Sequence, residues 1–137
     1  MKKLSDEQKI FNKVSRHLLK QGKKSVEKSE DEGLVCVYRG PEGEKCAVGC
    51  LINDEYYSKV LENKTVFDPK VQEVLEKSGV ELNVVKDEYG TQKGNPIFNM
   101  LSSLQNIHDS EKPSRWAQKL RQFGRIKGLD ISHLEGK

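Results

Sequence analysis

Apolar residues near the N-terminus recur every three or four positions, which is the spacing of one face of a helix. The stripe consists of Ile10, Val14 and Leu18, with Phe11 and Leu19 beside them. Ser5 and Gln8 fit a capping box at the start of this helix, and Gly22 suits its end. The pattern therefore predicts a helix over residues 5–21. Residues 23–32 are charged and carry no apolar repeat, which predicts a solvent-exposed connector.

The longest apolar run of the chain lies in residues 35–52, next to its clearest turn signal. Residues 35–39 are rich in β-branched and aromatic side chains and alternate as a strand does. Residues 40–43, Gly-Pro-Glu-Gly, provide the turn, because proline presets φ and glycine tolerates positive φ. Residues 45–52 are predicted to return as a second strand or as a strand that runs into a helix. Their uniformly apolar composition places them in the core in either case.

Helix signals continue through the second half of the chain. Further helices are predicted to begin near Asn53, at Asp68-Pro69, at Asn95-Pro96 and at Pro113-Ser114. Between them, residues 80–85 are predicted to be a short strand or an extended edge, and residues 86–95 a loop. Residues 129–137 form a short tail that can be loose. The chain is thus predicted to be a single domain over 1–137, of the α+β class and mostly α, with four to five helices packed around a small antiparallel β-hairpin.

Composition narrows the class of protein. The 137 residues suffice for one modest core, and 33% charged with 34% hydrophobic residues is typical of a globular protein with a wet surface. No segment approaches the roughly 20 apolar residues of a membrane span. The N-terminus turns acidic at Asp6 and Glu7 before an apolar run develops, unlike a signal peptide. Three cysteines, an odd number, then predict reduced thiols in a cytoplasmic protein.

Positive charge gathers at the two ends of the chain. The net charge of +3 is too small to indicate nucleic-acid binding by itself, but residues 113–128 hold five basic residues and no acid. The N-terminal segment is basic as well. No helix-turn-helix pattern is present and acidic residues are spread through the middle, which argues against binding of duplex DNA.

The stretch YRGPEGEKCAVGCLI, residues 38–52, resembles a motif of small, mostly uncharacterised proteins encoded by tailed phages and their bacterial hosts. The residues that match the pattern of this group are Leu19, Gln21, Gly22, Ser25, Val26, Cys36, Tyr38, Arg39, Gly40, 45–52, Leu104, Ile107, His108, Asp109 and Trp116. Asn53 stands where the group commonly has proline, a difference that affects a helix cap. The resemblance implies a phage context, in which such small proteins are often host-takeover or anti-defence factors.

A cysteine enzyme is the sharpest catalytic hypothesis. Cys46 follows a turn and would have a lowered thiol pKa at a helix start, and His108 lies downstream in the order of a cysteine–histidine dyad. Asp109 cannot easily orient the ring of its neighbour, because adjacent helical residues point about 100° apart. The apolar neighbours of Cys46 also suit burial, which is common for free cysteine. The pattern favours a structural role for Cys46.

A zinc site is the second alternative. Zinc needs three or four convergent ligands, and Cys36, Cys46, Cys50 and His108 are the candidates. Cys46 and Cys50 are four residues apart, a workable spacing on a helix. The two-residue spacing of cysteine knuckles does not occur in the chain. No metal and no cofactor is therefore predicted.

An anion-binding pocket is the third candidate site. Arginine grips phosphate in a bidentate fork and an aromatic ring can stack on a base. The candidate ligand-binding residues are Tyr38, Arg39 and Lys45 near the turn, and Arg115, Lys119, Arg121 and Arg125 in the last helix. Backbone groups of the loop 90–95 could add donors. The alternative is a solvated helix face, with Arg39 paired to an internal acid.

These patterns favour a binding protein over an enzyme. We expect a small cytoplasmic, phage-type accessory protein that acts in the host cell and antagonises host defence. It would sequester a phosphorylated nucleotide signal or cover a surface of a host protein, without contacting a membrane. The runner-up is a cysteine-dependent hydrolase or transferase that uses Cys46 and His108. Oligomeric state, the partner and the reactivity of the cysteines stay open.

Overall fold

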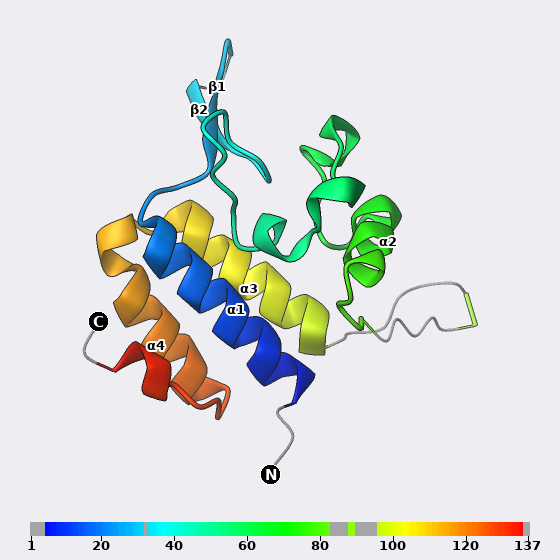
Figure 1. Ribbon diagram of the computed structural model, residues 1–137. Helices are drawn as coiled ribbons and strands as arrows, with labels where there is room; N and C mark the ends of the chain where they lie inside the picture. The colour runs from blue at the N-terminus through cyan, green and yellow to red at the C-terminus, as the bar shows by residue number, and fades with distance from the viewer. Residues whose placement is uncertain (1–4, 32, 83–87, 90–95, 136–137) are drawn as a thin grey trace.

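Three helices pack against one another in every pair and form the main body of the fold. They are α1 (Asp6–Gln21), α3 (Pro96–Ser110) and α4 (Trp116–Ile126). In the computed structural model, which describes residues 5–31, 33–82, 88–89 and 96–135, a shorter helix α2 (Pro69–Lys77) lies to one side and a two-stranded hairpin projects from one end (Figure 1). The mostly helical α+β class predicted from the sequence is confirmed.

Local capping signals explain where the helices begin and end. The Ser5 side chain accepts a hydrogen bond from the backbone N–H of Gln8, at 3.1 Å, and starts α1. Gly22 adopts a left-handed φ of 68° and ends the helix, as a C-terminal glycine does. Asp68 caps α2 by accepting from Lys70 N at 2.8 Å. These boundaries match the predicted ones because each is set by side chains within one turn.

The hairpin lies earlier in the chain than the sequence predicts. Strands β1 (Val26–Ser29) and β2 (Gly33–Cys36) pair antiparallel, with Val26 opposite Cys36 and Ser29 opposite Gly33. Of the predicted pairing between 35–39 and 45–52, one isolated bridge between Arg39 and Lys45 is formed. The apolar pattern misplaced the strands because this hairpin is largely exposed and so leaves little alternation to detect, with Leu34 71% exposed.

Residues 45–52 are core, as predicted, but they are neither a strand nor an α-helix. They contain one 3₁₀ turn, Gly49–Leu51, and their backbone is satisfied by helix side chains. Gln21 of α1 accepts from Lys45 N at 2.9 Å and donates to Lys45 O at 2.9 Å. Gln105 of α3 accepts from Val48 N at 3.0 Å. This segment is therefore placed by tertiary contacts and not by a repeating backbone pattern.

The predicted loose tail is docked as far as residue 135. Gln8 of α1 accepts from the backbone N–H of Asp130 at 2.8 Å and donates to its carbonyl at 2.9 Å. His133 contacts the Ser15 hydroxyl at 2.7 Å, and Leu134 is fully buried. The tail is docked by contacts with residues that are distant in the sequence, and a local sequence pattern does not predict such contacts.

The remaining segments differ from the prediction in smaller ways. The short helix predicted after Asn53 is two 3₁₀ turns, Asp54–Tyr56 and Lys59–Leu61. Residues 80–82 form no strand, and 83–85 lie outside the described residues, as does most of the predicted loop 86–95. Among the helices of the described ranges, none combines the length and the apolar character that crossing a bilayer requires.

Candidate functional site

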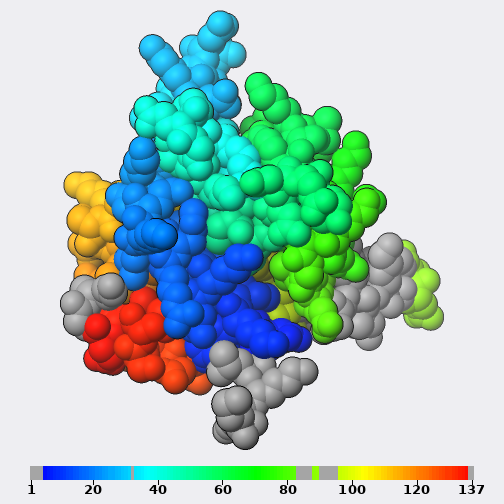
Figure 2. All heavy atoms as spheres, in the orientation of Figure 1, coloured from blue at the N-terminus to red at the C-terminus, as the bar shows by residue number. Residues whose placement is uncertain are grey.

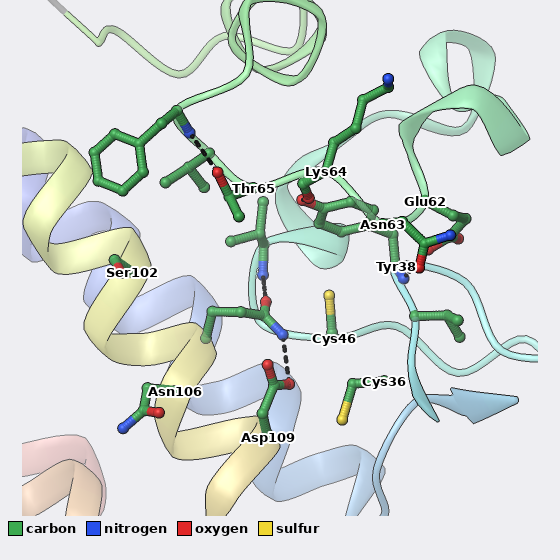
Figure 3. Close-up of a pocket in the computed structure, with 15 residues that line it drawn as sticks. Cys36, Tyr38, Cys46, Glu62, Asn63, Lys64, Thr65, Ser102, Asn106 and Asp109 are labelled. Carbon is green, nitrogen blue, oxygen red and sulfur yellow. Dashed lines mark hydrogen bonds between the residues drawn. The ribbon is translucent and has the colours of Figure 1, made fainter. Parts of the chain in front are cut away.

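One pocket, of about 320 Å³, opens between α3 and the segments that follow β2 and the 3₁₀ turn Lys59–Leu61 (Figure 3). Four side chains on one face of α3 form one wall, since they occupy positions i, i+3, i+4 and i+7. These are Ser102, Gln105, Asn106 and Asp109. The facing walls come from Cys36–Tyr38, Cys46, Val48 and residues 62–67. The pocket thus has a polar helix face on one side and a mixed loop surface on the other.

Asp109 is the charged centre of this pocket. Its Oδ1 accepts from His108 Nδ1 at 2.7 Å and from Gln105 Nε2 at 2.8 Å, and the Cys36 sulfur lies within 4.8 Å of its carboxylate. Burial opposes ionisation of Asp109, but the hydrogen bonds from His108 and Gln105 hold the pKa of this carboxyl below its ordinary value. The pocket therefore contains a carboxylate that is ionised and held in place before any ligand arrives.

His108 orients Asp109 and is not itself available for chemistry. The side chain is fully buried and its ring stacks on Trp116, with 5.5 Å between ring centroids. The backbone N–H of Ser25 donates to His108 Nε2 at 2.9 Å, so Nε2 is the acceptor and the ring proton sits on Nδ1, facing Asp109. Both ring nitrogens are therefore engaged in structural hydrogen bonds.

This hydrogen bonding also decides the metal alternative. Cys36, His108 and Asp109 offer ligand atoms within 4.8 Å of one another, the one such group in the described part of the chain. Cys46 and Cys50, the other candidate ligands of the zinc alternative, are not members of it. A metal at His108 Nδ1 would require the proton to move to Nε2, where it would face the N–H of Ser25. The residues present do not fit a metal ion.

The thiols are poorly suited to nucleophilic attack. Cys46 is buried, its Sγ accepts from Gly49 N at 3.3 Å, and burial raises its pKa. Burial also raises the pKa of Cys50 to about 12, and that of Cys36, which the nearby Asp109 raises as well, to about 11. Cys46 lines the pocket but His108 does not, so the predicted dyad is not assembled there.

Alkylation of the native protein will test this description of the thiols. We expect iodoacetamide to label Cys36 slowly, because a pKa of about 11 leaves on the order of 100-fold less thiolate than an ordinary cysteine has at neutral pH. The labelling rate of Cys36 will rise with pH until the pH reaches this pKa of about 11. Cys46 and Cys50 will be protected until the protein is denatured. Mass spectrometry of peptides after timed labelling measures each rate.

The Asp109→Asn variant is the matched control for that measurement. It removes the negative charge beside the Cys36 sulfur and keeps a side chain of the same size, so Cys36 should be labelled faster. Fast labelling of Cys46 in the native wild type would contradict the structural role of this residue and would support the cysteine-enzyme hypothesis.

The two predicted basic residues near the turn pair with an acid of the same chain whose side chain is exposed. Arg39 pairs with Asp54 at 3.1 Å, donates to Ile52 O at 2.7 Å and lies 5.1 Å over the Tyr57 ring. Lys45 reaches the same Asp54 oxygen at 3.4 Å. The third residue of this predicted set, the buried Tyr38, donates its hydroxyl to the carbonyl of Lys64. Tyr38 alone among the three lines the pocket.

The basic residues of the last helix lie elsewhere. Arg115 and Lys119 share Glu111, at 3.9 and 3.6 Å, and Arg121 approaches Leu134 O at 3.5 Å. Arg125 is exposed. Helix α1 contacts both α4 and the 3₁₀ turn Gly49–Leu51, and it lies between them (Figure 1). The structure therefore does not bring the two predicted basic sets into one pocket.

Sequence reasoning missed the polar face of α3 and the role of Asp109 in it. The signal was present as hydrogen-bonding residues at helical spacing beside the apolar stripe, but a polar stripe is normally read as a solvated face. Comparison of the chain with protein-family models, with curated proteins and with solved structures finds no match.

Proposed function

We propose that this protein acts by binding, with the pocket beside Asp109 as its recognition site for a positively charged, hydrogen-bond-donating group. The observation that carries the proposal is the preorganised Asp109 carboxylate at the wall of an open pocket. In the phage setting that the sequence resemblance suggests, the bound group belongs to a host factor in the host-cell cytoplasm. Its capture antagonises host defence.

The charge balance of the pocket supports a cation. Its ionisable lining residues besides the thiols and Tyr38 are Glu62, Lys64 and Asp109. The Lys64 ammonium points away from the pocket in Figure 3, whereas the Asp109 carboxylate faces it. Glu62 is occupied, because it accepts from Tyr38 N at 2.8 Å and from the Tyr57 hydroxyl at 2.6 Å. Hydrogen bonds leave the negative charge of Glu62 in place, as they do for Asp109, so the two carboxylates together make the potential in the pocket negative.

The size of the pocket supports a small group. A volume of about 320 Å³ lies at the lower end of the roughly 300–1,000 Å³ typical of small-molecule sites. This suits a guanidinium or a substituted ammonium with a short carbon stem. Asn63 and Asn106 also line the pocket, and the Asn106 amide oxygen, which already accepts from the Ser110 hydroxyl at 3.0 Å, has a second lone pair for an N–H group of such a cation.

A phosphorylated nucleotide has less support. Arg39 and Lys45 share the single carboxylate of Asp54, and Arg115 and Lys119 share Glu111, so about half of this predicted phosphate-binding charge is compensated within the chain. A phosphate in the pocket itself would approach Asp109 and be repelled. The nucleotide hypothesis remains a distinct outcome of the experiment below.

Titration by NMR with agmatine, a small guanidinium compound, tests the proposal. We expect agmatine to shift the side-chain amide signals of Gln105, Asn106 and Asn63, and adenosine monophosphate to leave them unchanged. The Asn106→Arg variant places a positive charge in the pocket and should abolish these shifts. Its matched control is Gln118→Arg, which adds the same charge at an exposed position of α4 and should bind agmatine normally.

Two results would overturn the proposal. One is the lack of any agmatine-dependent shift at the pocket residues. The other is binding of adenosine monophosphate that Arg39→Ala abolishes, which would restore the anion-binding hypothesis instead.

A further inference from the structure

The outer edge of β2 has backbone groups that no other strand in the described ranges uses. Val37 N donates to Ser25 O at 3.0 Å, so residues 25 and 37 form a hydrogen-bonded pair of the antiparallel ladder. Such pairs alternate with non-hydrogen-bonded ones. The pairs Cys36–Val26 and Leu34–Lys28 are therefore non-hydrogen-bonded, and their N–H and C=O groups point away from the partner strand. Cys36 and Leu34 present theirs along the outer edge of β2.

This edge leads directly into the pocket. Tyr38 is next in the same register after Leu34 and Cys36, and its N–H is taken by Glu62, which lines the pocket. Glu62 thus closes the edge at one end, while Leu34 and Cys36 are exposed at the other. The Cys36 side chain also lines the pocket and contacts Asp109. Edge, pocket and carboxylate form one continuous surface.

The hairpin itself is an incomplete sheet. It stands clear of the body of the protein at the top of Figure 2, and its two strands have exposed or half-buried side chains throughout. A two-stranded hairpin is marginally stable in water, and an added strand completes its hydrogen bonding. Leu34, 71% exposed, lies on the same face as Cys36 and offers apolar contact beside the pocket.

We propose that an extended segment of a partner polypeptide adds to the outer edge of β2 as a third strand and places an arginine or lysine side chain in the pocket against Asp109. This inference rests on the proposed function and names its partner as a basic peptide segment. In an added strand, the residue opposite Cys36 directs its side chain to the same face as Cys36, toward Asp109. Backbone pairing supplies affinity and the pocket selects the basic residue.

The geometry favours this edge over the edge of β1. Val26 and Lys28 present their outward backbone groups on the opposite side of the hairpin, and neither lines the pocket. A strand added to the edge of β1 would therefore not place a side chain next to a carboxylate of the pocket. The two edges therefore provide an internal comparison, in which only the β2 edge should matter.

Short synthetic peptides test the proposal without altering the protein. The probe is a peptide of alternating threonine and valine with one central arginine, measured by the NMR shifts of the pocket amides. We expect it to bind at least about tenfold more tightly than agmatine, because it adds backbone hydrogen bonds. Replacing the arginine by glutamate should abolish binding. Two further peptides carry N-methyl groups on alternate residues, one on the odd-numbered and one on the even-numbered positions. Only one of these two sets of N–H groups faces β2, so one peptide should lose binding and the other should keep it.

Protein variants then locate the edge. Cys36→Pro removes the outward N–H on β2 and should weaken peptide binding about tenfold or more. Cys36→Ala removes the thiol and keeps the N–H, so it should weaken peptide binding clearly less than Cys36→Pro does, and the difference between the two variants reports the backbone hydrogen bond. Lys28→Pro is the matched change on the edge of β1 and should also bind nearly normally. Agmatine shifts of each variant report whether its pocket is intact.

The outcomes separate this inference from the proposed function. If agmatine binds and the peptide binds no better, or if both N-methylated peptides bind equally, strand addition is overturned and the pocket proposal stands. If neither agmatine nor the peptide binds, the proposed function fails as well. If the protein dimerises and Cys36→Pro makes it monomeric, the edge serves a second copy of the chain, and the partner-segment proposal is overturned.

Discussion

Replacement of His108 by alanine will lower the free energy of unfolding by about 3–5 kcal/mol, a large part of the stability of a domain of this size. The variant leaves the buried N–H of Ser25 without its acceptor and the Asp109 carboxylate without one donor. It also leaves a cavity where the ring stacks on Trp116. Urea denaturation followed by circular dichroism measures the loss.

Two further variants keep this prediction decisive. His108→Gln retains an amide oxygen that can accept from Ser25 and an NH₂ that can donate to Asp109, so it should recover part of the loss. Asn106→Ala, on the same helix but exposed, should change stability by no more than about 0.5 kcal/mol. A loss below about 1 kcal/mol for His108→Ala would show that the hydrogen bonds from Ser25 to His108 and from His108 to Asp109 contribute little to the stability of the fold.

Replacement of Gly49 by alanine will destabilise the protein by about 2–3 kcal/mol, because the new methyl group has no room. A Cβ at this position would lie 2.4 Å from the backbone carbonyl oxygen of Tyr38. Backbone cannot yield as a flexible side chain can, so the 3₁₀ turn or the segment around Tyr38 must shift. Because Tyr38 also lines the pocket, agmatine shifts at the pocket should weaken in the same variant.

Gly43→Ala is the control for that experiment. Gly43 has a positive φ of 87°, and a Cβ added there would meet no heavy atom within 4 Å, so alanine costs only the backbone strain, about 1 kcal/mol. Urea midpoints of both variants decide between the two effects. Equal losses would mean that the close approach of Gly49 to Tyr38 has no energetic consequence.

Part of the candidate site followed from the sequence and part did not. The burial of Cys46 was predicted from its apolar neighbours and is confirmed at 1% exposure. The sequence also offers an acid of the same chain as an alternative partner for Arg39, and the structure pairs Arg39 with Asp54, whose side chain is exposed. The sequence predicts that Asp109 does not easily orient the ring of its helical neighbour, yet its Oδ1 lies 2.7 Å from His108 Nδ1. Side-chain rotation achieves what backbone direction alone does not.

The sequence by itself determined the bounds of α1 and the start of α2, since caps and apolar stripes act within a few residues: Ser5 starts α1, Gly22 ends it and Asp68 starts α2. It also determined that residues 45–52 are buried, because transfer of apolar surface from water needs no particular partner. Only the tertiary structure decided which backbone conformation this segment adopts, because its polar groups are satisfied by side chains of α1 and α3 that are distant in sequence. The pocket arose in the same way, where contacts between distant segments bring Cys36 and Asp109 together.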